Sequence, residues 1–71
     1  MSFSYDKLRG KIKEVCGTNS RFADLMSISD ATLSAKLNHK SEFTQPEIFK
    51  AVEILCLKRS DIPLYFFTPI V

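Results

Sequence analysis

FADLMSISDATLSAKL, at residues 22–37, is the stretch that decides the predicted fold. Ala23 is small enough to let two helices cross at close range, and Ser27 follows where a tight turn is needed. Leu33 and Leu37 are four residues apart, so they fall on one side of a second helix. This spacing is typical of a helix-turn-helix.

Polar residues mark the ends of these two helices. Ser29 is a natural cap for the second helix, and Asp30 suits its positive N-terminal end. The first helix is expected to begin at residues 18–19 and to end near Met26. The second helix is expected to end in the turn at residues 38–41, because asparagine tolerates the conformations that close helices.

Residues 4–16 predict a supporting helix that begins with a Ser4 cap and ends at Gly17. Its apolar side chains have the spacing of one helical stripe: Leu8, Ile12 and Val15.

A further helix is predicted after the central pair. Thr44 and Glu47 have the spacing of a capping box, and Pro46 fits the first turn. Phe43 is placed to pack onto Ile48 before the first turn. The apolar stripe of this helix is Ile48, Ala51, Val52 and Leu55.

The C-terminal residues are unusually apolar. A short helical turn is expected from Ser60 to about Phe66, and apolar residues continue to Val71. One interpretation is that Leu64, Phe66 or Phe67 folds back onto the core. The other is that these side chains form an exposed patch for a partner. Both interpretations can hold for different residues.

The predicted fold class is therefore all-α. We expect a compact bundle of four to five short helices that contains a repressor-like helix-turn-helix, with no strands. Residues 1–71 form a single helix-turn-helix domain.

The size of the chain argues against an enzyme. Its 71 residues are 45% hydrophobic and 25% charged. A domain this small needs nearly every apolar residue for one core, which leaves little to line a pocket of the ~300 Å³ that small-molecule sites usually need. A binding module with no small-molecule substrate and no cofactor is expected.

The cysteines and the histidine indicate no metal site. Cys16 and Cys56 each have apolar neighbours, so both are expected to be buried small side chains. His39 cannot complete a zinc site with two distant cysteines. The sequence shows no secretory signal and no membrane span, which predicts a cytoplasmic protein with reduced thiols.

The net charge of +2 allows contact with nucleic acid without requiring it. Positive charge is concentrated in the first predicted helix, which is either a solvated face or an edge that faces phosphates: Lys7, Arg9, Lys11 and Lys13.

Four segments together carry a family resemblance: FSYDKLRGKIKE at 3–14, ATLSAKLN at 31–38, EFTQPEI at 42–48 and YFFTP at 65–69. Through them the chain resembles small phage regulatory proteins with a repressor-like helix-turn-helix. Within that group it is similar to antirepressors of the modulator-of-repression type from temperate lactococcal phages. The resemblance implies a role in the lysis–lysogeny switch, with the phage immunity repressor as the partner.

The resemblance also places the recognition helix after Ser29. Its outward surface would then carry Asp30, Ala31, Thr32, Ser34 and Ala35, with Lys36 at the flank. Base edges in the major groove are best read by arginine, lysine, asparagine and glutamine. This helix presents few of these residues, so we expect weak or assisted DNA binding.

Two sets of candidate residues follow. The partner-binding or DNA-binding surface is predicted to comprise Arg21, Met26, Ile28, Ser29, Asp30, Ala31, Thr32, Ser34, Ala35 and Lys36. The predicted phosphate contacts are Lys11, Lys13, Lys36 and Lys40.

Two functions fit these observations. The first is an antirepressor that binds the N-terminal DNA-binding domain of the immunity repressor and changes its operator binding. The alternative is an independent Cro-like repressor that binds operator DNA as a dimer. No acid–base pair or activated nucleophile supports an enzyme.

Overall fold

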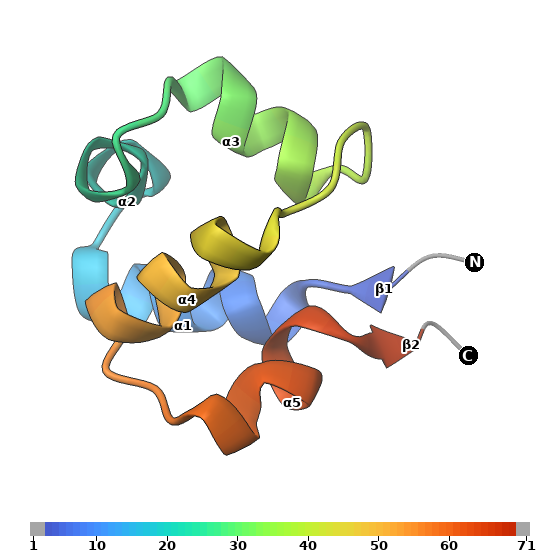
Figure 1. Cartoon of the computed structure of the whole chain (residues 1–71). Coiled ribbons are helices and arrows are strands. Elements are labelled where there is room, and N and C mark those ends of the chain that lie inside the picture. Colours follow the sequence, from blue (N-terminus) through green and yellow to red (C-terminus); the bar gives the residue numbers. More distant parts are fainter. Residues whose placement is uncertain (1–2, 70–71) are drawn as a thin grey trace.

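The computed structural model describes residues 3–69, which form a bundle of short helices closed by a small pair of strands (Figure 1). The all-α fold class is confirmed. In chain order the elements are β1 (Phe3–Ser4), α1 (Asp6–Cys16), α2 (Asn19–Met26), α3 (Asp30–Leu37), α4 (Gln45–Ile54), a 3₁₀ turn (Arg59–Asp61), α5 (Ile62–Phe66) and β2 (Thr68–Pro69).

The strands correct the expectation that the chain has none. β1 and β2 pair antiparallel, with Phe3 opposite Pro69 and Ser4 opposite Thr68. Strands of two residues are too short to show an alternating pattern in the sequence. They form because the end of the chain folds back beside its beginning.

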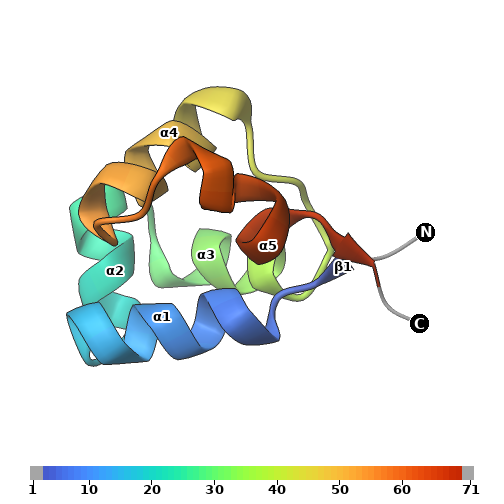
Figure 2. The same ribbon diagram turned by 90° about the horizontal axis from the view of Figure 1, so that it is seen from below.

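α3 lies on the opposite side of the bundle from α5. In Figure 1, α1 and α4 lie between these two helices, and the view from below in Figure 2 shows α5 in front and α3 behind. The exposed faces of α3 and α5 therefore point in different directions.

The core draws its side chains from all five helices. The largest fully buried side chains are Phe22, Phe66, Leu8, Ile12, Leu33 and Leu55. Val15 was expected to join Leu8 and Ile12, but 44% of its surface is exposed. The last turn of α1 directs the half-buried Cys16 toward the core instead.

The predicted Ser29 and Thr44 caps are confirmed, and Thr18 rather than Asn19 caps α2. The hydroxyls of Thr18 and Ser29 each accept a hydrogen bond from a backbone N–H in the first turn of α2 and α3. Thr44 and Glu47 form the expected capping box, with reciprocal bonds of 2.8 and 3.3 Å. These caps fix the starting points of the three helices.

The predicted Ser4 cap is wrong. Helix α1 begins at Asp6, with Tyr5 in the cap position and no side-chain cap. The Ser4 hydroxyl accepts only a long bond of 3.4 Å from the Asp6 amide. Ser4 cannot cap α1 because it already belongs to β1, paired with Thr68.

Three helices end in the same hydrogen-bonded turn around a left-handed residue. α2, α3 and α4 are closed at Ser27 (φ 61°), His39 (φ 64°) and Cys56 (φ 57°). At the end of α4, the Cys56 amide donates to Glu53 and the Leu57 amide donates to Val52. Only α1 uses a glycine, the predicted Gly17 (φ 85°).

The position of Cys56 corrects the expectation that both cysteines are buried. Cys16 is half-buried and Cys56 is exposed, and both are free thiols. The turn that closes α4 turns the Cys56 side chain outward. Burial raises the pKa of the Cys16 thiol, although Arg21 opposes this effect.

Replacing Cys56 with glycine is expected to stabilise the protein by about 0.5–1 kcal/mol, because glycine adopts a left-handed conformation without steric cost. The matched variant Cys56→Ala keeps the strained conformation and should change the unfolding free energy by less than about 0.5 kcal/mol. Urea denaturation of both variants tests this prediction. Equal stabilities of the two variants would show that the backbone at Cys56 is unstrained.

Within the apolar tail, Phe66 folds back onto the core, whereas Leu64 and Phe67 are exposed. Phe66 is 1% exposed and packs edge-to-face on Phe43, with ring centroids 5.4 Å apart. Leu64 and Phe67 are exposed by 43% and 46%. Ile70 and Val71 lie outside the described residues.

Candidate partner-binding surface

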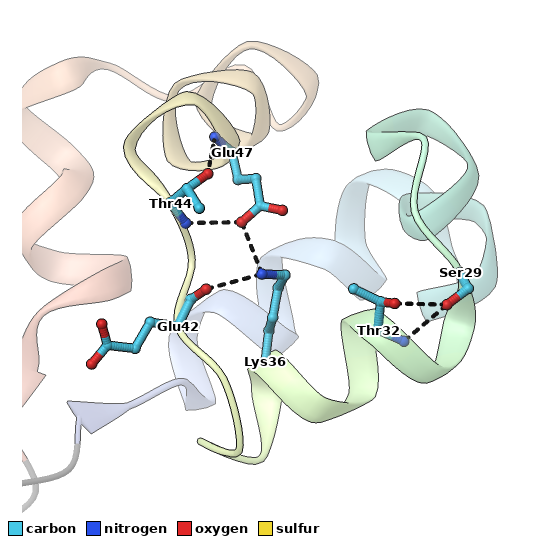
Figure 3. A network of polar contacts seen from close by, with 6 residues as sticks. All are labelled: Ser29, Thr32, Lys36, Glu42, Thr44 and Glu47. Atoms are coloured by element: carbon cyan, nitrogen blue, oxygen red, sulfur yellow. Dashed lines mark hydrogen bonds and ion pairs between the residues drawn. The ribbon is translucent and has the colours of Figure 1, made fainter.

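The candidate surface is built on α2, the turn and α3, here called the α2–α3 unit (residues 19–37). The Ser29 hydroxyl accepts from the Thr32 amide at 3.1 Å and donates to the Thr32 hydroxyl at 2.8 Å (Figure 3). Both side chains therefore take part in capping the N-terminus of α3. Their hydroxyls are less free to contact a partner than the sequence suggested.

The remaining outward face of α3 carries short side chains. Asp30, Ala31 and Ser34 are exposed and Ala35 is half-buried. The Ser20 hydroxyl of α2 donates to Asp30 Oδ2 at 2.7 Å, which holds the carboxylate at the start of α3. This face contains no exposed side chain that could bond a base edge at two points.

The position of Lys36 contradicts two predictions: that it lies at the flank of the binding surface, and that it contacts a phosphate. It is only 7% exposed. Its Nζ lies 2.9 Å from Glu47 Oε1 and donates to the Glu42 carbonyl at 2.9 Å (Figure 3). Its ammonium also lies 5.8 Å from the centre of the Phe43 ring. Lys36 faces inward because α4 supplies a carboxylate there, a contact that helical spacing cannot indicate.

Met26 and Ile28 also differ from the predicted surface. Met26 is 4% exposed and belongs to the core, and Ile28 is half-buried against it. In place of Met26, its neighbour Leu25 is 43% exposed. Leu25 and Met26 are adjacent apolar residues of α2, and only the packing decides which of them faces solvent.

Two side chains outside the predicted binding surface hold the α2–α3 unit in place. Arg9 of α1 donates to the Leu37 carbonyl at 3.0 Å and to Asn38 Oδ1 at 3.1 Å. Lys50 of α4 approaches the Met26 carbonyl at 3.5 Å. Each cation meets the negative end of a helix, which stabilises that end. Arg9 is therefore not simply part of a solvated or phosphate-facing edge.

Arg21 and the other candidate phosphate contacts lie on the surface. Arg21 is exposed in the first turn of α2. Lys11 Nζ lies 2.9 Å from Glu14 Oε2, whereas Lys13 and Lys40 are exposed.

The exposed charges of the α2–α3 unit give a slightly acidic surface. Arg21 is the exposed cation and Asp24 and Asp30 are the exposed anions, so one positive and two negative charges sum to −1. Arg9 and Lys50 add positive charge at the C-terminal ends of α3 and α2, so the negative charge of the unit is local to the two carboxylates.

Among residues 3–69, no helix has the length and apolar character needed to cross a bilayer.

The structure resembles one solved phage protein closely. It matches the solution structure of the modulator of repression (MOR) of the temperate bacteriophage TP901-1 from Lactococcus lactis, with 51% identity and a TM-score of 0.83. The match covers 94% of this chain and 90% of that protein. The resemblance drawn from the sequence is thereby confirmed, and it supports a regulatory role in a phage rather than an enzymatic one.

No curated protein sequence matches the chain. Residues 1–69 match the family described as Protein of unknown function (DUF739), so the chain belongs to that family.

Proposed function

We propose that this protein is an antirepressor that binds the DNA-binding domain of the phage immunity repressor through the exposed face of α3. Binding there competes with the operator or reshapes how the repressor contacts it. The observation that carries the proposal is the carboxylate of Asp30, held by Ser20 on a helix face otherwise made of small side chains.

Charge and shape both support a protein partner. A DNA-binding domain presents lysine and arginine toward its operator, and the exposed carboxylates of Asp24 and Asp30 complement such a surface. Ala31 and Ser34 are short, so a partner helix can approach the backbone of α3 closely. Because Ser20 fixes the Asp30 carboxylate in advance, little side-chain freedom is lost on binding.

Asp30→Arg is expected to weaken the complex with the isolated repressor domain by about tenfold or more, because it reverses a charge in the contact. Glu53→Arg is the matched control, since it makes the same charge change at an exposed position of α4. Calorimetric titration should show a change of less than about twofold for this control. Asp30→Arg should also raise the affinity for nonspecific DNA. Unchanged repressor binding by Asp30→Arg would refute the α3 interface.

The Cro-like alternative predicts tight operator binding by the protein alone, with a steep salt dependence and a dimer in sedimentation. The arrangement of the helices argues against it. Leu64 of α5 and Phe67, the residue after it, are exposed, and α5 lies across the bundle from α3 (Figures 1 and 2). Self-association through that side would direct the two α3 helices away from each other, so they could not enter neighbouring grooves of one duplex.

A further inference from the structure

A pocket lined with aromatic rings lies between β1, the segment that follows α3, and α5. Its volume is about 230 Å³. This pocket is separate from the outward face of α3, so the inference drawn from it does not depend on the proposed function. The rings that line it are Phe3, Tyr5, His39, Phe43, Phe66 and Phe67.

These rings hold one another in fixed orientations. Tyr5 and Phe43 pack edge-to-face at 5.6 Å, and Phe3 and Phe67 do so at 5.5 Å. Phe43 is also fixed by Phe66. Aromatic faces attract cations because the ring electrons concentrate negative charge there. His39 stacks on Tyr5 at 4.7 Å, and the Lys36 ammonium lies 5.8 Å from the centre of the Phe43 ring. The ring surfaces open to a further positive group are therefore those of the half-buried Phe3 and the exposed Phe67.

Glu42 adds a full negative charge to this pocket. Its backbone carbonyl is held by Lys36 at 2.9 Å, and its side chain points away from Lys36 (Figure 3). The ammonium of Lys36 is instead neutralised by Glu47. Among the described residues, no hydrogen bond or ion pair engages the Glu42 carboxylate. None of the described residues that line the pocket is a lysine or an arginine, and the other ionisable side chains there are His39 and Tyr5.

Tyr5 contributes a free polar atom to the same pocket. Its side chain is 9% exposed, and its hydroxyl makes no hydrogen bond to another described residue. The hydroxyl oxygen is accessible at the surface of the pocket. Every fully buried side-chain oxygen or nitrogen of the described residues has a hydrogen-bond partner, so an unpartnered oxygen is not fully buried. Burial, together with the negative charge of Glu42, raises the pKa of Tyr5, so the hydroxyl stays protonated.

We propose that this aromatic pocket binds the side chain of an arginine from a protein partner. The guanidinium would lie against the ring faces and donate N–H groups to the Glu42 carboxylate and the Tyr5 hydroxyl. A planar guanidinium stacks on rings and offers several donors in one fork, which the compact ammonium of lysine does not. The pocket is smaller than the ~300 Å³ or more typical of small-molecule sites, which favours a single side chain over a free ligand.

The test uses the intact chain and N-acetyl-arginine amide as the probe. Titration followed by aromatic ¹³C NMR should shift the signals of the pocket rings, with a millimolar dissociation constant. The neutral isostere N-acetyl-citrulline amide and N-acetyl-lysine amide should each bind at least about threefold more weakly. Equal binding of either compound, or shifts only outside the pocket, would overturn the proposal, as would the absence of any shift at tens of millimolar.

Two variants test the polar groups. Glu42→Gln keeps the size of the side chain and should weaken the arginine probe about threefold to fivefold. Tyr5→Phe should weaken it about twofold. Glu53→Gln, which removes an exposed charge of α4 outside the pocket, should leave the affinity unchanged. If Glu42→Gln and Glu53→Gln behave alike, the pocket does not recognise charge and the proposal fails.

Discussion

Replacing Phe66 with alanine is expected to leave most of the protein unfolded at room temperature. Phe66 is 1% exposed and joins α5 to the core through Phe43. Removing a buried phenylalanine ring typically costs about 3–5 kcal/mol, and a core of this size rarely supplies more than that in total. The variant should show a collapsed amide dispersion in NMR and no cooperative transition in urea.

Phe67 provides the control for this prediction, because the neighbouring ring has the same size and is 46% exposed. Phe67→Ala loses part of its contact with Phe3 and should cost no more than about 1 kcal/mol. A Phe66→Ala variant as stable as Phe67→Ala would mean that α5 does not close the core.

Replacing Glu47 with alanine should have the second-largest effect, a loss of about 3 kcal/mol. The change leaves the buried ammonium of Lys36 with the Glu42 carbonyl as its polar partner, and breaking a buried ion pair from one side typically costs this much. It also removes one half of the capping box. In a domain of this size, the melting temperature should fall by more than about 10 °C.

Glu53→Ala is the control, because Glu53 is an exposed carboxylate of the same helix, and it should change stability by less than about 0.5 kcal/mol. The double variant Lys36→Met/Glu47→Gln should recover much of the loss, because it removes both buried charges. A cost below about 1 kcal/mol for Glu47→Ala would show that the pair is not effectively buried.

The same pair predicts how stability depends on pH. Partial burial alone would raise the pKa of Glu47, but the Thr44 amide and the Lys36 ammonium outweigh burial and hold the pKa below its ordinary value of 4.5. A carboxyl whose pKa is lowered on folding stabilises the protein above its unfolded-state pKa, and this contribution is lost as the pH falls through the folded-state pKa. Stability should therefore fall as the pH drops below 4.5, and it should fall less in Glu47→Gln.

Local signals predicted the helices well. Thr18, Ser29 and Thr44 cap their helices because a hydroxyl next to free backbone amides acts over one turn, a range that sequence spacing describes. The β1–β2 pair joins residues more than sixty positions apart, and no local pattern carries that information. The sequence also did not indicate that α3 and α4 are closed by residues in the left-handed conformation, His39 and Cys56, because neither residue is a glycine.

The candidate surface was predicted less completely than the fold. The family resemblance correctly placed Asp30, Ala31 and Ser34 outward. It could not place Lys36, whose burial depends on a carboxylate from another helix, nor decide whether Met26 or Leu25 faces solvent. These outcomes depend on tertiary packing, which overrides the preference of a single residue type.

The pairing of Phe3 with Pro69 makes the described chain almost a closed ring. A short linker across these strands would join the two ends with little strain, since the loop to be closed is small. The chain could then be opened at the exposed turn of Gly17 and Thr18 without cutting a helix. Such a circular permutant should keep the fold, with its new termini beside α2.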